Sequence, residues 1–262
     1  MGILNVTPDS FSDGGAYRSV EEAVARGLEM EAEGAAILDV GGESTRPGSM
    51  PVPADEEMRR VIPVIRGLAA KTKAVVSVDT TKAAVASAAV AAGARIVNDT
   101  SALAGDPEMA AVVRASGAAV VLMHRRGSPA TMQEAPHYDA LFDELLAELA
   151  GRIGAAEGAG IDPERILVDP GIGFGKRLCD NLALHRHLDR LRILGRPIVF
   201  GPSRKSFIGS LTGAPPAERA FGTAAAVAAA VLRGAHVVRV HDVKEMREVV
   251  EVAYAIRGEA SW

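Results

Sequence analysis

Three acidic or amide residues stand directly after apolar runs of the kind that form buried strands. They are Asp79, Asn98 and Asp169. A carboxylate removed from water needs hydrogen-bond donors or a cation to offset its desolvation. A heterocycle with ring N–H and amino donors would satisfy two carboxylates and an amide together. The alternative is that these residues cap the following helices, as Asp and Asn often do. For Asp79 and Asp169 we favour ligand contact.

Basic residues and a histidine gather near the end of the chain. Arg204 and Lys205 follow one apolar run, and Arg239 and His241 end the next; Arg46 adds a cation after an early run. Loops after the seventh and eighth strands of parallel barrels often bind phosphate. Each residue alone would be read as a surface cation. In a chain of net charge −4, their convergence indicates an anionic ligand such as phosphate or diphosphate.

The first polar segment, residues 7–15, is rich in Asp, Ser and Gly. It contains Asp9 and Asp13, and Asn5 lies just before it. Hard oxygen ligands beside a diphosphate suit Mg²⁺, which takes few protein ligands and keeps several waters. The paired glycines at its end favour a loop that closes over substrate. The alternative is an ordinary Asp/Ser/Gly turn. The sequence has no His/Cys cluster with zinc spacing and no dinucleotide-binding fingerprint.

Eight apolar runs, each followed at once by polar residues, must position these groups. The runs cover residues 3–6, 37–40, 75–78, 95–97, 119–123, 166–168, 198–200 and 237–240. Strands buried on both faces read as continuous apolar runs, and strands that alternate with helices imply a parallel sheet. The pattern predicts an α/β fold, a (β/α)8 TIM barrel whose active site lies at the C-terminal rim of the strands.

The helices between the runs have recognisable start signals. Ser19 opens a capping box before the first helix, and Thr81 is expected to cap the third. Asp180 and Asp242 are expected to cap the sixth and eighth. A seventh helix is expected over residues 217–234.

Composition agrees with one barrel domain over residues 1–262. The hydrophobic fraction is 48%, which is sufficient for a large core. The acidic net charge argues against a nucleic-acid partner. No apolar stretch reaches the about 18 residues of a membrane span. A single cysteine, Cys179, cannot form an intrachain disulfide, so we expect a cytoplasmic protein.

Five motifs together resemble the dihydropteroate synthase family, over residues 1 to about 243. They lie at 5–13 (Asn-Val-Thr-Pro-Asp-Ser-Phe-Ser-Asp), 42–48, 169–176, 203–206 and 239–243. The family joins 6-hydroxymethyl-7,8-dihydropterin diphosphate to p-aminobenzoate and releases diphosphate, in folate biosynthesis. The family normally has residues upstream of the first motif, so the resemblance implies that a few N-terminal residues are missing here.

The resemblance implies a role for each matching position. The pterin ring would be held by Asp79, Asn98, Asp169 and Lys205, with Arg239 stacked on one face. The diphosphate would meet Asn5, Thr45, Arg46, Arg239 and His241, with Mg²⁺ at Asn5. The p-aminobenzoate pocket would use Phe11, Pro47, Lys205 and Ser206.

The resemblance also implies a dissociative, SN1-like substitution. Cations stabilise the leaving diphosphate, and fixed charges stabilise the pterin cation. The residues expected to carry catalysis are Asp79, Lys205, Asp13, Arg46 and His241. By hypothesis, Asp13 holds the cationic intermediate under the closed first loop.

Two other functions fit part of the pattern. A pterin-dependent methyltransferase on the same barrel would share the pterin carboxylates but lack the anion motifs at residues 45–46 and 203–206, which are present. A non-catalytic pterin-binding paralogue would be expected to lose loop or diphosphate residues, and none is lost. Proteins of this fold are often homodimers, and the last two helices are candidates for the interface.

Overall fold

The structure is a computed structural model that describes residues 1–6, 19–44, 49–128 and 131–258. It is built around eight parallel strands, in agreement with the eight apolar runs. They are β1 (Gly2–Asn5), β2 (Ile37–Gly41), β3 (Val75–Asp79), β4 (Ile96–Asp99), β5 (Ala119–Met123), β6 (Ile166–Asp169), β7 (Val199–Phe200) and β8 (Val237–Val238).

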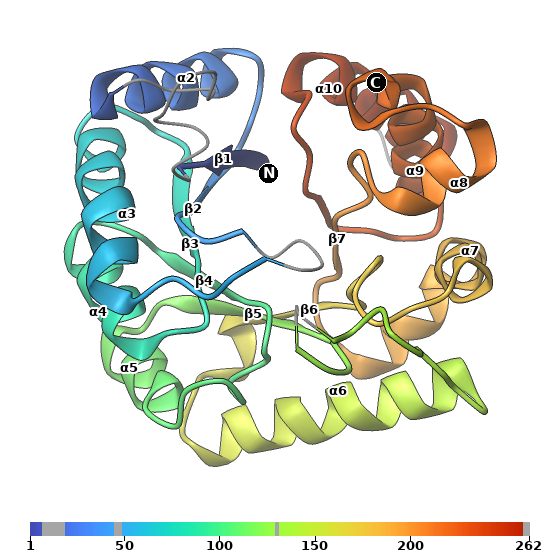
Figure 1. Ribbon diagram of the computed structural model, residues 1–262, viewed down its shortest axis with the longest axis horizontal. Helices are drawn as coiled ribbons and strands as arrows, with labels where there is room; N and C mark the ends of the chain where they lie inside the picture. The colour runs from blue at the N-terminus through green and yellow to red at the C-terminus, as the bar shows by residue number, and fades with distance from the viewer. Residues whose placement is uncertain (7–18, 45–48, 129–130, 259–262) are drawn as a thin grey trace.

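The strands close into a ring. Strands β1 to β6 pair in sequence order, and β7 pairs with β8. Two isolated bridges join the pieces, one between Val168 and Ile198 and one between Gly2 and Val240. The ring with its surrounding helices is visible in Figure 1. The (β/α)8 barrel prediction is confirmed.

Helices surround the strands of the ring (Figure 1). The α-helices are α2 (Val20–Ala32), α3 (Ala54–Ala69), α4 (Ala83–Ala91), α5 (Met109–Ser116), α6 (Leu141–Gly158), α7 (Leu178–Arg186), α8 (Ser206–Thr212), α9 (Ala220–Leu232) and α10 (Val243–Ile256). Short 3-10 helices occupy Pro163–Arg165, Leu188–Leu194 and Pro216–Glu218. The helix expected over residues 217–234 is α9, which begins at Ala220, and the separate short helix α8 lies before it. Among these described helices, none is long and apolar enough to cross a membrane.

Small residues let the outer helices approach closely. A Cβ atom at Gly27 of α2 would lie 2.6 Å from the Leu68 side chain of α3, and one at Gly67 would lie 2.7 Å from Val24. Leu68 is fully buried. Because interiors are packed as densely as organic crystals, extra atoms at these glycines would force the two helices apart. This packing explains how a chain with only 4% aromatic residues fills its core.

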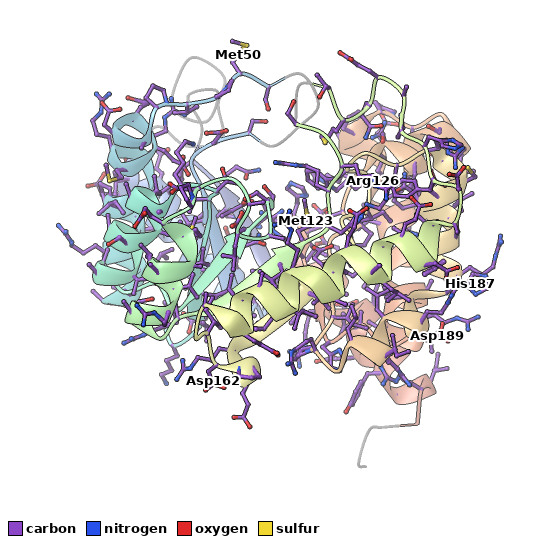
Figure 2. The ribbon with its side chains drawn as sticks, turned by 90° about the horizontal axis from the view of Figure 1, so that it is seen from below. Met50, Met123, Arg126, Asp162, His187 and Asp189 are labelled. Atoms are coloured by element: carbon purple, nitrogen blue, oxygen red, sulfur yellow. The ribbon has the colours of Figure 1, made fainter. Side chains whose placement is uncertain are left out.

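The two ends of the barrel can be told apart by their connections. Met50 follows β2 and lies at one end, whereas Asp162 precedes β6 and lies at the other (Figure 2). The end near Met50 is the C-terminal rim, where the polar residues that follow the strands collect.

Ser19 caps α2 as expected, the Thr81 cap is wrong, and the Asp180 and Asp242 caps are right only in part, because Asp180 joins a capping box from inside α7 and Asp242 occupies the N-cap position of α10 without a side-chain cap bond. The Ser19 hydroxyl accepts the N–H of Glu22 at 3.3 Å. Lys82, not Thr81, occupies the N-cap position of α4, without a side-chain cap bond. Asp180 lies at the third position of α7 and accepts the Arg177 N–H. Asp242 precedes α10 but makes no cap bond, because Arg204 binds its carboxylate.

The first free N–H of α4 is satisfied from the loop after β4. Asp106 Oδ2 accepts the Ala83 N–H at 2.9 Å, and its other oxygen accepts the Glu108 N–H at 3.0 Å. One carboxylate thus serves two helix starts, and it attracts the positive ends of both helices.

Replacement of this shared carboxylate is expected to cost more than removal of the residue that the sequence favoured as the cap. Asp106→Ala should lower the free energy of unfolding by about 1–2 kcal/mol, since two N–H groups lose their acceptor. Thr81→Ala should change it by less than about 0.5 kcal/mol. Urea unfolding of both variants measures the difference; equal losses would show that Thr81 is the cap.

Candidate active site

One row of the barrel carries three of the expected ligand residues. Backbone pairing aligns Asn5 with Gly41, Gly41 with Asp79, and Asp79 with Asn98. Paired residues of a parallel sheet project to the same face, so this row lines the barrel mouth. Gly41 leaves a gap in it, because a Cβ there would lie 3.7 Å from Asn5 Oδ1 and 3.8 Å from Asp79 Oδ2. The amide and the carboxylate therefore face a common space.

A fully buried aspartate lies one layer below this row. Asp39 is aligned with Ser77 in the sheet, and its Oδ1 accepts the Ser77 hydroxyl at 2.6 Å. Its Oδ2 accepts from Asn98 Nδ2 at 3.0 Å and from Arg239 Nε at 2.6 Å. Arg239 also donates from Nη2 to Asp79 Oδ2 at 2.7 Å. The Arg239 guanidinium thus joins β8 to two carboxylates on β2 and β3.

Burial sets the electrostatics of these groups. Desolvation raises the pKa of Asp79 to about 7, although Arg239 opposes the shift. Desolvation also opposes the charge of Arg239, but Asp39 and Asp79 outweigh it and raise the arginine pKa. A carboxylate held at such a pKa binds N–H donors strongly, because little water competes for it.

Asp169 ends β6 on another part of the rim. Its Oδ1 accepts the Gly171 N–H at 2.7 Å. Burial raises the pKa of Asp169, while that N–H and the charge of Lys205 oppose the rise. Asp169 and Lys205 are thus close enough to interact electrostatically.

The loops after β7 and β8 are tied to each other. The Ser203 hydroxyl lies 2.9 Å from His241 Nδ1 and accepts the His241 backbone N–H at 3.1 Å. Lys205 stands directly before α8, and Ser206 is the first, exposed residue of that helix. Arg204 was expected among the anion-binding cations. Its guanidinium instead forms an ion pair with Asp242.

Lys205 is positioned by an aromatic ring from the β6 loop. Its ammonium lies 4.0 Å from the centre of the Phe174 ring, within the range of a cation–π contact. A Cβ at Gly173 would lie 3.1 Å from Lys205 Cδ, so this glycine makes room for the lysine stem. Phe174 was not singled out from the sequence.

Several expected site residues lie outside the described residues. They are Phe11, Asp13, Thr45, Arg46 and Pro47. The described ends of the loop that contains residues 45–48 are held together by Glu43, whose Oε2 accepts the Val52 N–H at 3.2 Å. Lys82 forms an ion pair with Glu43 and with the fully buried Glu57. This arrangement sets where the loop leaves and rejoins the barrel.

The amide oxygen of Asn5 on β1 suits magnesium better than it suits a metal ion whose ligands all come from the protein. Among the described residues, no group of three or more His, Cys, Asp or Glu side chains is arranged to hold a metal ion. Asn5 offers one amide oxygen beside the space left by Gly41. Mg²⁺ accepts such a site because it takes its remaining ligands from water and substrate phosphates.

Comparison with known proteins agrees with this geometry. The family model described as "Pterin binding enzyme" matches residues 1–241, so the class is that of the pterin-binding enzymes. The dihydropteroate synthase of Synechocystis sp. is 46% identical over 257 residues, which are 98% of this chain and 89% of the relative.

Solved structures agree. The dihydropteroate synthase of Yersinia pestis, in a sulfonamide drug complex, superimposes with a TM-score of 0.95 at 42% identity, over 98% of this chain and 94% of that one. The enzyme of Xanthomonas albilineans with 7,8-dihydropteroate gives 0.88 at 49% identity, over 98% and 92%. This chain therefore belongs to the dihydropteroate synthase family, transferases of folate biosynthesis.

Asp39 and Phe174 are the main residues that sequence reasoning missed. Asp39 lies inside the run 37–40, which was read as apolar throughout. A charged residue within a buried strand needs a partner, and that requirement was the available signal. Phe174 lies in the glycine-rich motif at 169–176, of which only Asp169 was predicted to be a site residue.

Asp39→Asn is expected to destabilise the protein by about 3 kcal/mol, because it leaves the partly buried Arg239 short of its fully buried carboxylate partner. Ser77→Ala removes one hydrogen bond to the same carboxylate but leaves the ion pair in place, and it should cost about 1.5 kcal/mol. Denaturant unfolding compares the two variants. A loss below about 1 kcal/mol for Asp39→Asn would mean that Asp79 alone holds the arginine.

Proposed function

We propose that the row formed by Asn5, Asp79 and Asn98, with Arg239 and Asp169, holds the pterin of dihydropterin diphosphate for transfer to p-aminobenzoate. The observation that carries this proposal is the cluster of buried carboxylates around one arginine at the barrel mouth. A reduced pterin presents several N–H donors along one edge. Asp79, Asn98 and Asp169 accept or share these bonds, and Lys205 completes the set.

Arg239 has two proposed roles. Its planar guanidinium, held by Asp39 and Asp79, provides a flat cationic surface on which one face of the pterin stacks. It also adds positive charge toward the diphosphate. A guanidinium fixed in advance by two carboxylates needs little reorganisation when substrate binds.

The diphosphate subsite is proposed to lie on the side of β1 and β8. Asn5, Arg239 and His241 supply its described part, and Thr45 and Arg46 complete it. The Ser203 contact to His241 Nδ1 at 2.9 Å orients the imidazole, whose Nε2 is the proposed donor to an oxygen of the ligand. Asn5 would hold Mg²⁺, which supplies Lewis-acid neutralisation of the leaving diphosphate.

The p-aminobenzoate subsite is proposed to use Lys205 and Ser206 with Phe11 and Pro47. Ser206 is exposed at the start of α8 and Lys205 directly precedes it. The ammonium of Lys205 lies at the boundary of the two substrates.

The proposed reaction is a dissociative substitution at the pterin methylene carbon. The C–O bond to diphosphate breaks first, and its electron pair leaves with the diphosphate. Asp79 stabilises the pterin cation, with Asp13 as its proposed partner on the first loop, while Arg46, Lys205 and His241 stabilise the anion. The aniline nitrogen then forms the new C–N bond and loses a proton. Fixed charges of both signs lower the barrier to this charge separation.

Three further assignments stay predictions. Residues 1–262 form one pterin-binding domain, supported by a ring that starts at β1 and closes on β8. The cytoplasmic location rests on the lone cysteine. The homodimer is supported by exposed apolar side chains on the last two helices, Phe221 at 91%, Ile256 at 70% and Val252 at 61% exposed; sedimentation of the purified protein distinguishes dimer from monomer.

The test of the function is dihydropteroate formation from the pterin diphosphate and p-aminobenzoate, with and without Mg²⁺. Lys205→Ala is expected to lower kcat/KM by about 10²–10³, as does the loss of one preorganised donor in other enzymes. Lys71→Ala, an exposed lysine far from the rim, should match the unmodified enzyme. Folded protein that binds the pterin but makes no product would instead identify a non-catalytic paralogue.

A further inference from the structure

The turn after β6 is fixed by side chains at three successive carbonyl groups. The carbonyls of Gly173, Phe174 and Gly175 accept, in that order, from Gln133 Nε2 at 2.7 Å, Lys176 Nζ at 3.1 Å and Tyr138 OH at 3.0 Å. Gly173 and Gly175 have φ angles of +79° and +60°, which other residues adopt only with strain. All three acceptors are therefore held by side chains, which fixes the position of the turn.

Lys176 is the unusual member of this set. It is 3% exposed, and its ammonium nitrogen also lies 2.9 Å from His124 Nδ1 and 3.4 Å from the His124 carbonyl. Within the part of the chain that the structure describes, no carboxylate forms an ion pair with it. Desolvation lowers its pKa to about 7. A buried amine without a carboxylate is costly, and nothing in the proposed reaction uses it.

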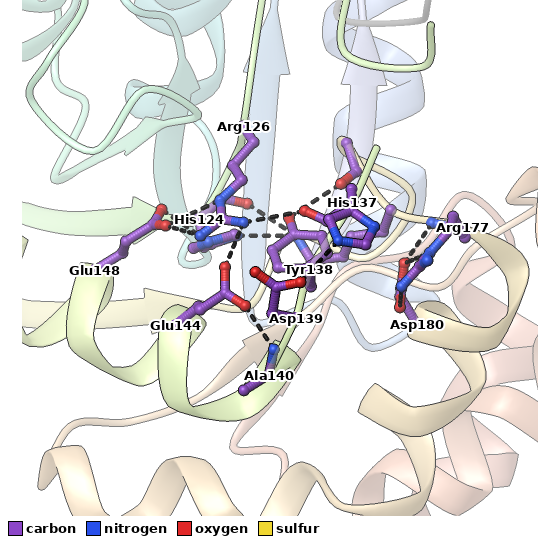
Figure 3. Close-up of polar contacts among 12 residues, drawn as sticks. His124, Arg126, His137, Tyr138, Asp139, Ala140, Glu144, Glu148, Arg177 and Asp180 are labelled. Atoms are coloured by element: carbon purple, nitrogen blue, oxygen red, sulfur yellow. Dashed lines mark hydrogen bonds and ion pairs between the residues drawn. The ribbon is translucent and has the colours of Figure 1, made fainter. Parts of the chain in front are cut away.

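His124 accepts from Lys176 in a neutral form. Burial lowers the pKa of His124 to about 2, so Nδ1 keeps a lone pair for the amine. Its Nε2 lies 3.1 Å from Glu148 Oε2, although without the alignment of a hydrogen bond. Arg126 pairs with Glu148 and stacks on Tyr138, with 4.3 Å to the ring centre. Figure 3 shows the contacts of Glu148 with His124 and Arg126, which tie the β5 loop to α6.

The turn after β6 also sets the position of the Phe174 ring. That ring packs with Met123 and Met132, and Lys205 Nζ lies 4.0 Å from its centre. The backbone at Phe174 is held by one side-chain donor, Lys176. A shift of this carbonyl would move the Phe174 ring, and the Lys205 ammonium would lose its cation–π contact.

We propose that Lys176 is a positioning residue for Lys205: by holding the Phe174 carbonyl, it fixes the aromatic ring against which the Lys205 ammonium lies. It acts on substrate only through Phe174 and Lys205. This inference rests on the proposed contact of Lys205 with substrate, and the experiment below separates the two.

The experiment is a double-mutant cycle on the full chain, read out as binding of the pterin diphosphate without p-aminobenzoate. Lys176→Met keeps the length of the side chain and removes the donor. It should weaken binding about tenfold, and Lys205→Ala should weaken it at least as much. The double variant should bind no more weakly than Lys205→Ala alone, because coupled residues are not additive.

Two controls keep the result interpretable. Lys71→Met makes the same chemical change at an exposed site and should leave binding unchanged. Lys176→Gln retains a donor and should recover part of the affinity. Lys176→Leu, which also lacks a donor, replaces Lys176→Met in the cycle if that variant does not fold.

The outcomes separate the two ideas. Additive losses in the double variant, with Lys205→Ala itself weakened, would overturn the positioning role alone. If Lys205→Ala binds normally, the substrate contact of Lys205 fails, and the positioning role fails with it. An unaltered affinity in Lys176→Met would also overturn the inference.

Discussion

The structure depends most on the buried contact between Asp39, Arg239 and Asp79. Arg239 enters from the last strand, and the two carboxylates come from β2 and β3. An arginine in this interior is tolerated only because both carboxylates compensate its charge, and they in turn need it. The same contact therefore joins the end of the barrel to its beginning and supplies the mouth with opposite charges at fixed positions.

Above this contact, the register of the sheet brings further site residues together. Asn5, Gly41, Asp79 and Asn98 form one row because parallel strands pair at matched heights. In the proposed function, residues far apart in the chain thereby face one ligand. The β6 turn adds Asp169 and Phe174 from one side, and the joined loops of Ser203 and His241 add the other. Each group is held before substrate arrives, which suits a reaction that separates charge.

The sequence predicted the strands well because buried parallel strands leave an unbroken apolar signal; residues 119–123 coincide with β5. Caps were predicted less well. The Asp242 carboxylate forms an ion pair with Arg204 instead of capping α10, and the first N–H of α4 is bound by Asp106 from the loop after β4. Contacts between distant segments therefore decided the caps, and the local sequence did not. The short helix α8 was missed because it has only 7 residues and no apolar period to reveal it. Asp39 was hidden because hydrophobic neighbours mask a charge whose partner is 200 residues away.

The ring is not equally strong around its circumference. Strands β1 to β6 form a continuous ladder, whereas β7 and β8, of two residues each, join it through isolated bridges. Local opening is cheapest where few backbone hydrogen bonds must break. The barrel is thus a stiff arc that contains Asp79, Asn98 and Asp169, closed by a more compliant arc made of β7, β8 and the loops that follow them. In the proposed function, Lys205 and His241 lie on this compliant arc, so the rim can adjust there at least cost as the diphosphate leaves.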